Sequence, residues 1–477
     1  MPAQIKAYFR HHHNKRQRRA FVRAMKRKLA TLRRAVEACG PNTGGTGESA
    51  PDPAPPACSP SLYSAPNTEM NEGTTNSSLP VRPDNGQVRA VMLFVDFPDL
   101  HGSESMTALY DRLVPAAKRW FTEVSYGQLR FDATPVKRWY RMPRRVGSYN
   151  LADGISWTEH YDYIGDAVRA ADADFDFSPY QIVYVVAPKG SGIERSPAFH
   201  AYAGSGIQAD GNELRAGATF FEDTRFNARY AANVLIHETG HILGLPDLYD
   251  VPDPVYWRLF RFAGGWDMMS WNDPGAHFLA WNKWKLGWLD SSQLTCLDGP
   301  GELTTTITPL ERAGGLKAVV VPTSGTSTYV IEARRKIGQD EGLCETGVLV
   351  YSVDSATRGG YGPIRVRAAQ RDTSSDLVNR CGPLYNAPFD KAKGEVATFE
   401  DLSAGLSVRV LSSGANGYRV NVTRTSLTSQ SVELNVASSG SGEGVVTGES
   451  LAPPYPLLPT PFPFGLDWDF GSPVHAH

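Results

Sequence analysis

The sequence of 477 residues has few cysteines and no long apolar run. No stretch of about 18 consecutive apolar residues occurs, so the sequence predicts no transmembrane anchor. Its five cysteines include no Cys-x-x-Cys pair, which argues against a thiolate zinc site or a redox motif, and their pairing stays open. The amino terminus also lacks the apolar run of about 7–15 residues that marks a secretory signal.

The charges are unevenly distributed along the chain. Residues 1–40 hold 12 Lys and Arg against one acidic residue, whereas the remaining residues hold 36 basic and 49 acidic ones. The basic character therefore belongs to a terminal arm, and we expect no nucleic acid to bind the core. Apolar residues between Phe21 and Val36 recur three or four positions apart, which predicts a basic amphipathic helix. A solvated tail, a pro-segment, a targeting segment and upstream sequence wrongly joined to the gene all remain open for this arm.

Composition divides the rest of the chain. Residues 41–86 are rich in Pro, Gly, Ser and Thr and predict a disordered linker. Residues 87–290 mix strand and helix patterns, and we expect a catalytic α+β domain there. Residues 291–424 show short β-rich runs between Gly and Ser turns, which predict a β-sandwich-like domain. Residues 425–477 read as a low-complexity tail.

Within 87–290 the pattern gives specific elements. It predicts buried strands at 88–97 and 182–186, helices at 105–122, 157–171 and 225–243, and a hairpin over 124–140 around the turn at Tyr126 and Gly127. Asp223 or Thr224 is the expected N-cap of the third helix.

The strongest chemical signal is the segment from His237 to Asp247, which reads His-Glu-Thr-Gly-His-Ile-Leu-Gly-Leu-Pro-Asp. On a helix, His237 and His241 lie one turn apart on the same face, so both imidazoles can bind one zinc ion. Glu238 is offset around the helix and can act on a water without ligating the metal. A turn at Gly244 would bring Asp247 back as a third ligand. Three protein ligands leave the open position that catalytic zinc requires.

Chance and packing are the alternative explanations of this segment. The His-Glu-x-x-His string alone is expected by accident in roughly one chain in a hundred of this length, and the added Gly and Asp make an accident far rarer. The alternative to a metal site is a purely structural role, with two hydrogen-bonded core histidines beside a buried Glu238. Met269, 28 residues after His241, follows Gly-Gly-Trp-Asp-Met and is the candidate for a structural methionine turn beneath the ligands.

The chain resembles the immune inhibitor A family of secreted bacterial zinc metallopeptidases. That family carries His-Glu-x-x-His-x-x-Gly-x-x-Asp followed by a Trp-Asp-x-Met turn. The resemblance covers roughly residues 88–424. Besides the motif, the similar segments are Phe94–Asp99, Glu123–Gly127, Asp247–Asp250, Lys285–Trp288, Tyr329–Arg334 and Gly347–Val353.

The resemblance implies a metzincin-like zincin domain, with a twisted sheet and an active-site helix, followed by a β-sandwich-like domain. It also implies a secreted zinc endopeptidase that binds calcium as a structural ion and is made with a pro-segment. The chain departs from that pattern in two ways. It shows no recognisable signal peptide, and Ser270 and Trp271 follow Met269 where some metzincins have a tyrosine that stabilises the transition state. Transition-state stabilisation then falls either to zinc alone or to another residue, for which Tyr249 and Tyr256 are the candidates.

Together these features predict a monomeric zinc-dependent endopeptidase that hydrolyses peptide bonds in proteins or peptides. Zn²⁺ is held by His237, His241 and Asp247, and Glu238 is the general base for a metal-activated water. Three alternatives stay open: a zinc-dependent hydrolase of a non-peptide amide, a catalytically silent binding protein, and a binder of nucleic acid or anionic membranes through the basic arm.

Three weaker signals accompany this site. Asp172, Asp174 and Asp176 stand at alternate positions, which suits either a calcium loop or a solvated acidic loop. His277 follows the methionine turn and either lines the cleft or packs in the core. Cys39 could occupy the open zinc position as a cysteine switch, although a lone cysteine near a linker needs no such role.

Overall fold

The computed structural model describes Cys58, Glu72 and residues 86–151, 155–253, 255–274, 276–370, 374–393 and 396–426. The predicted basic arm with Cys39, most of the predicted linker and nearly all of the predicted tail lie outside these residues. Among the described residues, no helix combines the length and the apolar character that crossing a membrane requires.

The first sheet has five strands in the order β2-β1-β3-β7-β4. Four of these strands run parallel, and β4 is antiparallel to β7 at one edge. Because both faces of the sheet are covered, its central strands are almost continuously apolar. The strands are β1 (Gln87–Asp96), β2 (Arg130–Arg141), β3 (Ile182–Val186), β4 (Ala198–His200) and β7 (Ala216–Phe220).

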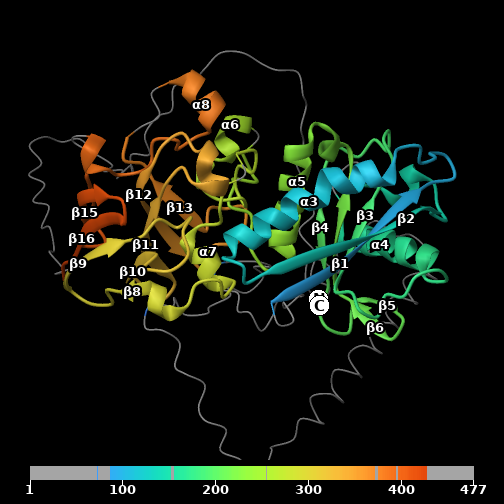
Figure 1. The fold of residues 1–477 in the computed structure, drawn as a ribbon, viewed down its shortest axis with the longest axis horizontal. Helices are drawn as coiled ribbons and strands as arrows, with labels where there is room; N and C mark the ends of the chain where they lie inside the picture. Colours follow the sequence, from blue (N-terminus) through green and yellow to red (C-terminus); the bar gives the residue numbers. More distant parts are fainter. Residues whose placement is uncertain are drawn as a thin grey trace, which may run out of the picture. The chain divides into compact units, whose positions relative to one another are not determined.

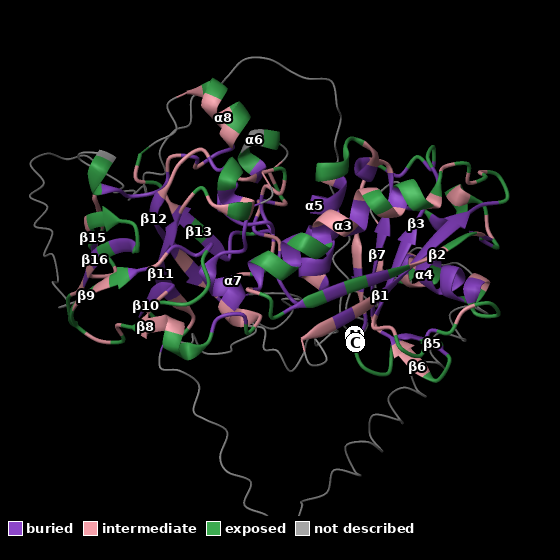
Figure 2. Cartoon of the chain, viewed as in Figure 1, coloured by how far each residue is buried: buried purple, intermediate pink, exposed green. Residues whose placement is uncertain are grey.

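Three helices cover this sheet (Figure 1). They are α3 (Met106–Val124), α4 (Trp157–Ala171) and α5 (Ala228–Ile242). Alternate residues of β1 separate the two faces: Met92 packs with α3 and α5, whereas Leu93 packs with α4. Figure 2 shows the resulting buried layer in purple along β1, β3, β7 and α5. A two-stranded sheet of β5 (Ile207–Ala209) and β6 (Asn212–Leu214) lies in the connection before β7.

Two sequence predictions in this region are wrong. Residues 124–140 form no hairpin, because Tyr126 and Gly127 adopt left-handed φ values of 57° and 79° just after α3 ends, and the chain then enters the single parallel strand β2. The N-cap of α5 is Asn227, whose side chain accepts the amide of Tyr230 at 2.8 Å. Asp223 instead accepts hydrogen bonds from the backbone and hydroxyl of Ser196.

The remaining strands form two sheets that pack on each other. One has the order β13-β12-β11-β10-β8 and the other the order β14-β15-β16-β9. A shared apolar cluster joins them, with residues such as Val319 and Ile331 on one side and Val408 and Val420 on the other. The strands are β8 (Leu294–Cys296), β9 (Gly301–Ile307), β10 (Ala318–Pro322), β11 (Ser327–Arg334), β12 (Gly347–Asp354), β13 (Ile364–Arg367), β14 (Thr398–Asp401), β15 (Leu406–Gly414) and β16 (Gly417–Arg424).

Several sheets and few helices make the described chain a mixed α and β protein, which is compatible with the predicted α+β class. Three short helices complete it: α6 (Tyr256–Leu259), α7 (Ala280–Lys285) and α8 (Ser375–Cys381).

Four of the five cysteines form two disulfides, Cys58–Cys296 and Cys344–Cys381. Cys58 belongs to the stretch predicted as a disordered linker, yet it is buried against the core. Glu72 of the same stretch is also buried, and it accepts a hydrogen bond from Trp281 Nε1 at 3.1 Å. At these two positions the structure differs from the composition-based prediction, because composition does not reveal single anchoring residues.

Candidate metal centre

Helix α5 presents three of the predicted site residues, His237, Glu238 and His241. The helix ends in a Schellman motif at Gly244, whose φ is +95°. Gly244 N–H donates to His241 O at 2.9 Å, and Leu245 N–H donates to Gly240 O at 3.0 Å. The predicted left-handed turn at Gly244 is thus present, and it returns the chain towards the helix.

That turn brings Asp247 to the two histidines. Asp247 Oδ1 lies 3.2 Å from His237 Nε2 and 3.1 Å from His241 Nε2. Among the residues that the structure describes, His237, His241 and Asp247 are the single group of three or more His, Cys, Asp or Glu side chains that could share a metal ion. The three predicted ligand residues therefore meet at one point.

The second nitrogen of each imidazole has a fixed partner. His237 Nδ1 lies 2.9 Å from Met268 O, and His241 Nδ1 lies 2.8 Å from Leu245 O. Because a carbonyl oxygen only accepts, each Nδ1 carries the hydrogen and donates it. A neutral imidazole then turns the lone pair of Nε2 towards Asp247, which is the tautomer that metal ligation needs.

Positive charge near His237 Nε2, His241 Nε2 and Asp247 Oδ1 would stabilise their close approach. Two Nε2 lone pairs facing one carboxylate oxygen repel it unless each nitrogen is protonated or one cation lies between them. Ligand atoms bound tetrahedrally at about 2.0–2.1 Å from zinc stand about 3.3 Å apart. The observed separations of 3.1 and 3.2 Å, and a donor set of two nitrogens and one oxygen, therefore fit zinc.

Glu238 is almost fully buried next to these residues, with 7% of its surface exposed. Burial raises the pKa of Glu238 to about 8, because desolvation disfavours the carboxylate. The imidazole of His237 and the backbone N–H of Ala198 in β4 oppose that rise, whereas the Asp247 carboxylate adds to it. Glu238 thus faces both the histidine pair and the edge strand of the first sheet.

Beneath the helix lies the turn that contains Met269. A Cβ on Gly240 would overlap Met269 Sδ, so this glycine permits the close approach of the methionine to the helix. Buried Asp267 shapes the turn, because its carboxylate accepts the amides of Met269 and Leu279, both at 2.7 Å. Leu248 N–H donates to Met269 O at 2.9 Å and ties the turn to the Asp247 loop.

The two tyrosine candidates have different places. The ring of Tyr249 stacks on His237, with centroids 6.1 Å apart, and burial together with the Asp247 carboxylate raises its pKa well above the usual range. Tyr256 lies on α6 and is 53% exposed. Tyr249 is therefore the one of the pair that packs directly against a predicted ligand.

The weaker sequence candidates do not join this site. His277 is fully buried, and its Nδ1 lies 2.8 Å from Lys283 Nζ, so the packing alternative holds and the cleft-lining one is wrong. Asp174 pairs with Arg138, and the alternate aspartates at 172–176 form no three-residue cluster in the described part of the chain.

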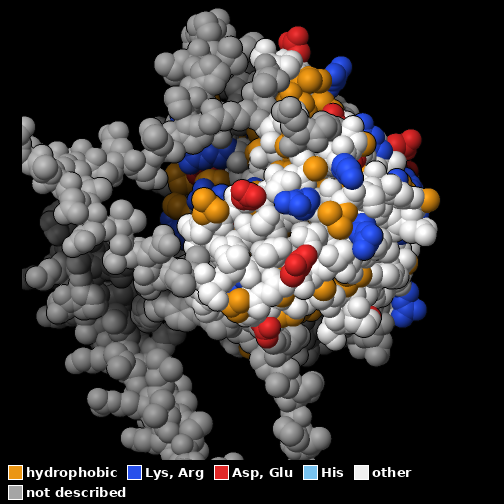
Figure 3. Space-filling model, turned by 90° about the vertical axis from the view of Figure 1, so that its left-hand side faces the viewer, with side chains coloured by type: hydrophobic (Ala, Val, Ile, Leu, Met, Phe, Trp, Pro, Cys, Tyr) orange, Lys and Arg blue, Asp and Glu red, His pale blue; other side chains and the backbone are white. Residues whose placement is uncertain are grey.

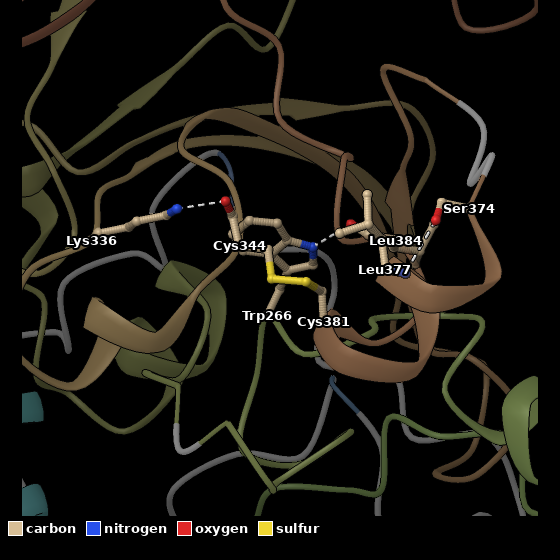
Figure 4. Close-up of a disulfide and its surroundings, with 7 residues drawn as sticks. All are labelled: Trp266, Lys336, Cys344, Ser374, Leu377, Cys381 and Leu384. Carbon is tan, nitrogen blue, oxygen red and sulfur yellow. Dashed lines mark hydrogen bonds between the residues drawn. A yellow bond between two sulfur atoms is a disulfide. The ribbon is translucent and has the colours of Figure 1, made fainter.

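Sequence reasoning missed the contacts that later residues make with the site. Arg334 Nη1 donates to the carbonyl oxygen of Trp266, in the methionine turn, at 2.8 Å. The side chain of Trp266 makes a second such contact. Its indole Nε1 donates to Leu384 O at 2.8 Å, beside the Cys344–Cys381 disulfide (Figure 4). No local motif marks these contacts, since they join residues that lie far apart in sequence.

The comparisons with known proteins assign no family to this chain. No family model matches the chain, and no curated protein matches it. Among solved structures, it is similar to metalloproteinase-II from Bacteroides fragilis, with a TM-score of 0.24 and 13% sequence identity over 44% of this chain and 55% of that one. The chain thus spans about half the length of that structure.

Proposed function

We propose that this chain is a zinc-dependent endopeptidase whose metal is held by His237, His241 and Asp247 and whose general base is Glu238. The observation that carries the proposal is the meeting of both Nε2 atoms with one Asp247 oxygen, while both Nδ1 atoms donate to carbonyls. A carboxylate that is not one of the three, Glu238, lies beside them. A metal ion held by these three residues would lie next to the base Glu238.

Each residue has a defined task in the proposed hydrolysis. A bound zinc ion supplies Lewis-acid polarisation of the attacking water and the scissile carbonyl. Glu238 takes the proton of the water and then delivers it to the leaving amine. The hydrogen bonds from both Nδ1 atoms hold the imidazoles in one tautomer and one orientation.

The edge strand β4 favours a peptide over a small amide as substrate. β4 pairs with β7 on one side and contacts Glu238 through the backbone N–H of Ala198. An extended polypeptide that adds to the outer edge of such a strand lies beside the base. A small amide is too short to form backbone hydrogen bonds along this edge strand, so the strand would not add to its binding affinity.

We also propose a metzincin-like zincin of the immune inhibitor A type, with a catalytic part at 87–290 and a β-rich part at 291–424. The parallel sheet with one antiparallel edge strand, the His-His-Asp group and the turn at Met269 support this. Export is supported by the two disulfides, since disulfides persist in oxidising compartments. A structural calcium ion and a monomeric state remain predictions.

The test is cleavage of casein by the full chain, followed on gels. We expect activity that a zinc chelator removes and that added zinc restores, with no turnover of an N-acetyl amino acid amide. Asp247→Ala should lose both zinc and casein cleavage. Zinc-loaded, folded protein that cuts only the small amide would favour the non-peptide hydrolase, and protein that cuts neither would favour the binding protein.

A further inference from the structure

A cavity of about 550 Å³ opens between the two sheets of the β-rich part. Residues of β11, β12 and β13 line one side of it, and the β14–β15 turn and the end of β16 line the other. None of His237, Glu238, His241 and Asp247 lines it. A space of this size accommodates a small ligand.

Three arginines face this cavity without a carboxylate partner. Arg365, Arg367 and Arg424 line it, and none of them has an acidic oxygen within 4.0 Å among the described residues. Arg367 Nη2 donates to Ser352 Oγ at 3.1 Å, and Arg365 donates only to backbone carbonyls. Arg367 Nε and Arg424 Nη1 are shielded from solvent and have no hydrogen-bond partner in the described part of the chain. A shielded N–H group without a hydrogen-bond partner carries a desolvation cost.

The two carboxylates that line the cavity are already satisfied by neutral donors. Asp401 accepts the hydroxyl of Tyr329 at 2.6 Å and that of Ser403 at 2.5 Å. Asp354 accepts the amide of Ala356 and the hydroxyl of Thr357. Neither therefore neutralises the guanidinium groups by direct contact.

The outer surface of the same part of the molecule differs from the cavity. In Figure 3, Lys and Arg side chains are interspersed with Asp and Glu on the described face. On the face that Figure 3 shows, charges of both signs alternate, so the gathering of arginines in the cavity is not repeated across that face.

We propose that this cavity is a binding site for an oxyanion, namely a carboxylate, sulfate or phosphate group. Guanidinium groups bind such groups through charge-assisted and frequently bidentate hydrogen bonds. An oxyanion here would accept from guanidinium N–H groups of the arginines that line the cavity and would balance the charge of the three arginines. The site is separate from the proposed zinc centre, so it does not depend on peptidase activity.

The experiment is equilibrium dialysis of the full chain with radiolabelled sulfate, with sodium chloride holding the ionic strength constant. We expect one saturable site per chain. Arg367→Gln and Arg424→Gln should each weaken sulfate binding at least about tenfold, because each removes a charged donor. Competition by phosphate and by acetate then ranks the three kinds of oxyanion.

The matched control is Arg409→Gln, because Arg409 is an exposed arginine of β15 that does not line the cavity. Its sulfate affinity should equal that of the parent. Circular dichroism checks that each variant is folded, and either cavity variant suffices if the other does not fold. Absence of saturable binding in the parent, or an equal loss in Arg409→Gln, would overturn the proposal.

Discussion

The backbone N–H of Gly360 donates a hydrogen bond of 2.8 Å to the carbonyl oxygen of Asp247. Gly360 lies in the loop between β12 and β13, and its own carbonyl accepts the N–H of Val251 at 3.0 Å. A loop of the β-rich part therefore holds the backbone of the proposed third ligand. The two parts of the chain that composition separates meet at the candidate metal centre.

Replacement of Gly360 tests this contact. Gly360 has a φ of +75°, and an added Cβ would lie 2.5 Å from Val251 Cγ2, so Gly360→Ala should displace the loop that bears Asp247. We expect zinc affinity to fall about tenfold, because loss of a supporting contact to a ligand typically costs 10–100-fold. Competition with a chromophoric chelator measures it.

Gly314→Ala is the control for backbone strain. Gly314 has a similar φ of +71°, but open space surrounds its would-be Cβ. Both variants pay the cost of a left-handed alanine, about 1 kcal/mol in the free energy of unfolding. Equal zinc affinity in the two variants would show that the Gly360 loop does not position Asp247.

Glu238→Ala separates the proposed base from the ligands. The side chain is not among the three that converge, so the variant should retain zinc. Casein cleavage should fall by about 10²–10⁴-fold, the usual contribution of a general base. His241→Ala, in contrast, should lose zinc and activity together. A Glu238→Ala protein as active as the parent would remove Glu238 from the mechanism.

Gly240 is predicted to be intolerant of even one methyl group. Alanine usually stabilises a helix by about 0.5–1 kcal/mol relative to glycine, but at position 240 its Cβ would overlap Met269 Sδ. We expect Gly240→Ala to lower the free energy of unfolding by about 1–3 kcal/mol, as overpacking does. Urea unfolding measures this change.

Gly165→Ala in α4 is the matched helical control. There the nearest atom to an added Cβ is the flexible end of Arg169, at 3.2 Å, so the substitution should be neutral or stabilising. In addition, Met269→Ala should restore part of the free energy of unfolding lost in Gly240→Ala, because removal of the methionine side chain leaves space for the added Cβ. A double variant whose loss equals the sum of the single losses would contradict direct packing of these residues.

The sequence could predict the elements whose signal is local. The run at Ile182–Val186 is a buried strand, 157–171 is a helix with a Ser156–Glu159 capping box, and Gly244 makes the turn that returns Asp247. Periodicity, capping and glycine conformation act over a few residues, so one segment is enough to reveal them.

The contacts that support the candidate site could not be predicted in this way. Cys58 pairs with Cys296 across 238 positions, and Gly360 reaches Asp247 from another sheet. Such contacts depend on how the sheets are placed in space, and five cysteines alone allow too many pairings. A fragment that starts at residue 87 would lose Cys58 and Glu72, so activity should be measured on the full chain.

Arg334 gives the last prediction, because it joins three buried carboxylates of the β-rich part to the methionine turn. Its guanidinium lies 3.2 Å from Glu311, 3.2 Å from Glu332 and 2.6 Å from Asp340, and all four side chains are fully buried. Removal of the cation in Arg334→Met leaves buried carboxylates uncompensated, and it also removes the donor to Trp266 O. We expect the free energy of unfolding to fall by about 3–5 kcal/mol.

Lys118→Ala is the control for loss of an ion pair. Lys118 Nζ lies 2.9 Å from Asp132 Oδ1, but both side chains are about half exposed, so water replaces the lost contact. Its removal should cost no more than about 1 kcal/mol in the same urea titration. A loss in Arg334→Met as small as that in Lys118→Ala would show that the buried carboxylates take up protons and tolerate the missing cation. A large loss together with weakened zinc binding would instead make Arg334 part of the support for the proposed metal centre. Trp266 lies in the same turn as Met268, whose carbonyl oxygen accepts the hydrogen bond of His237.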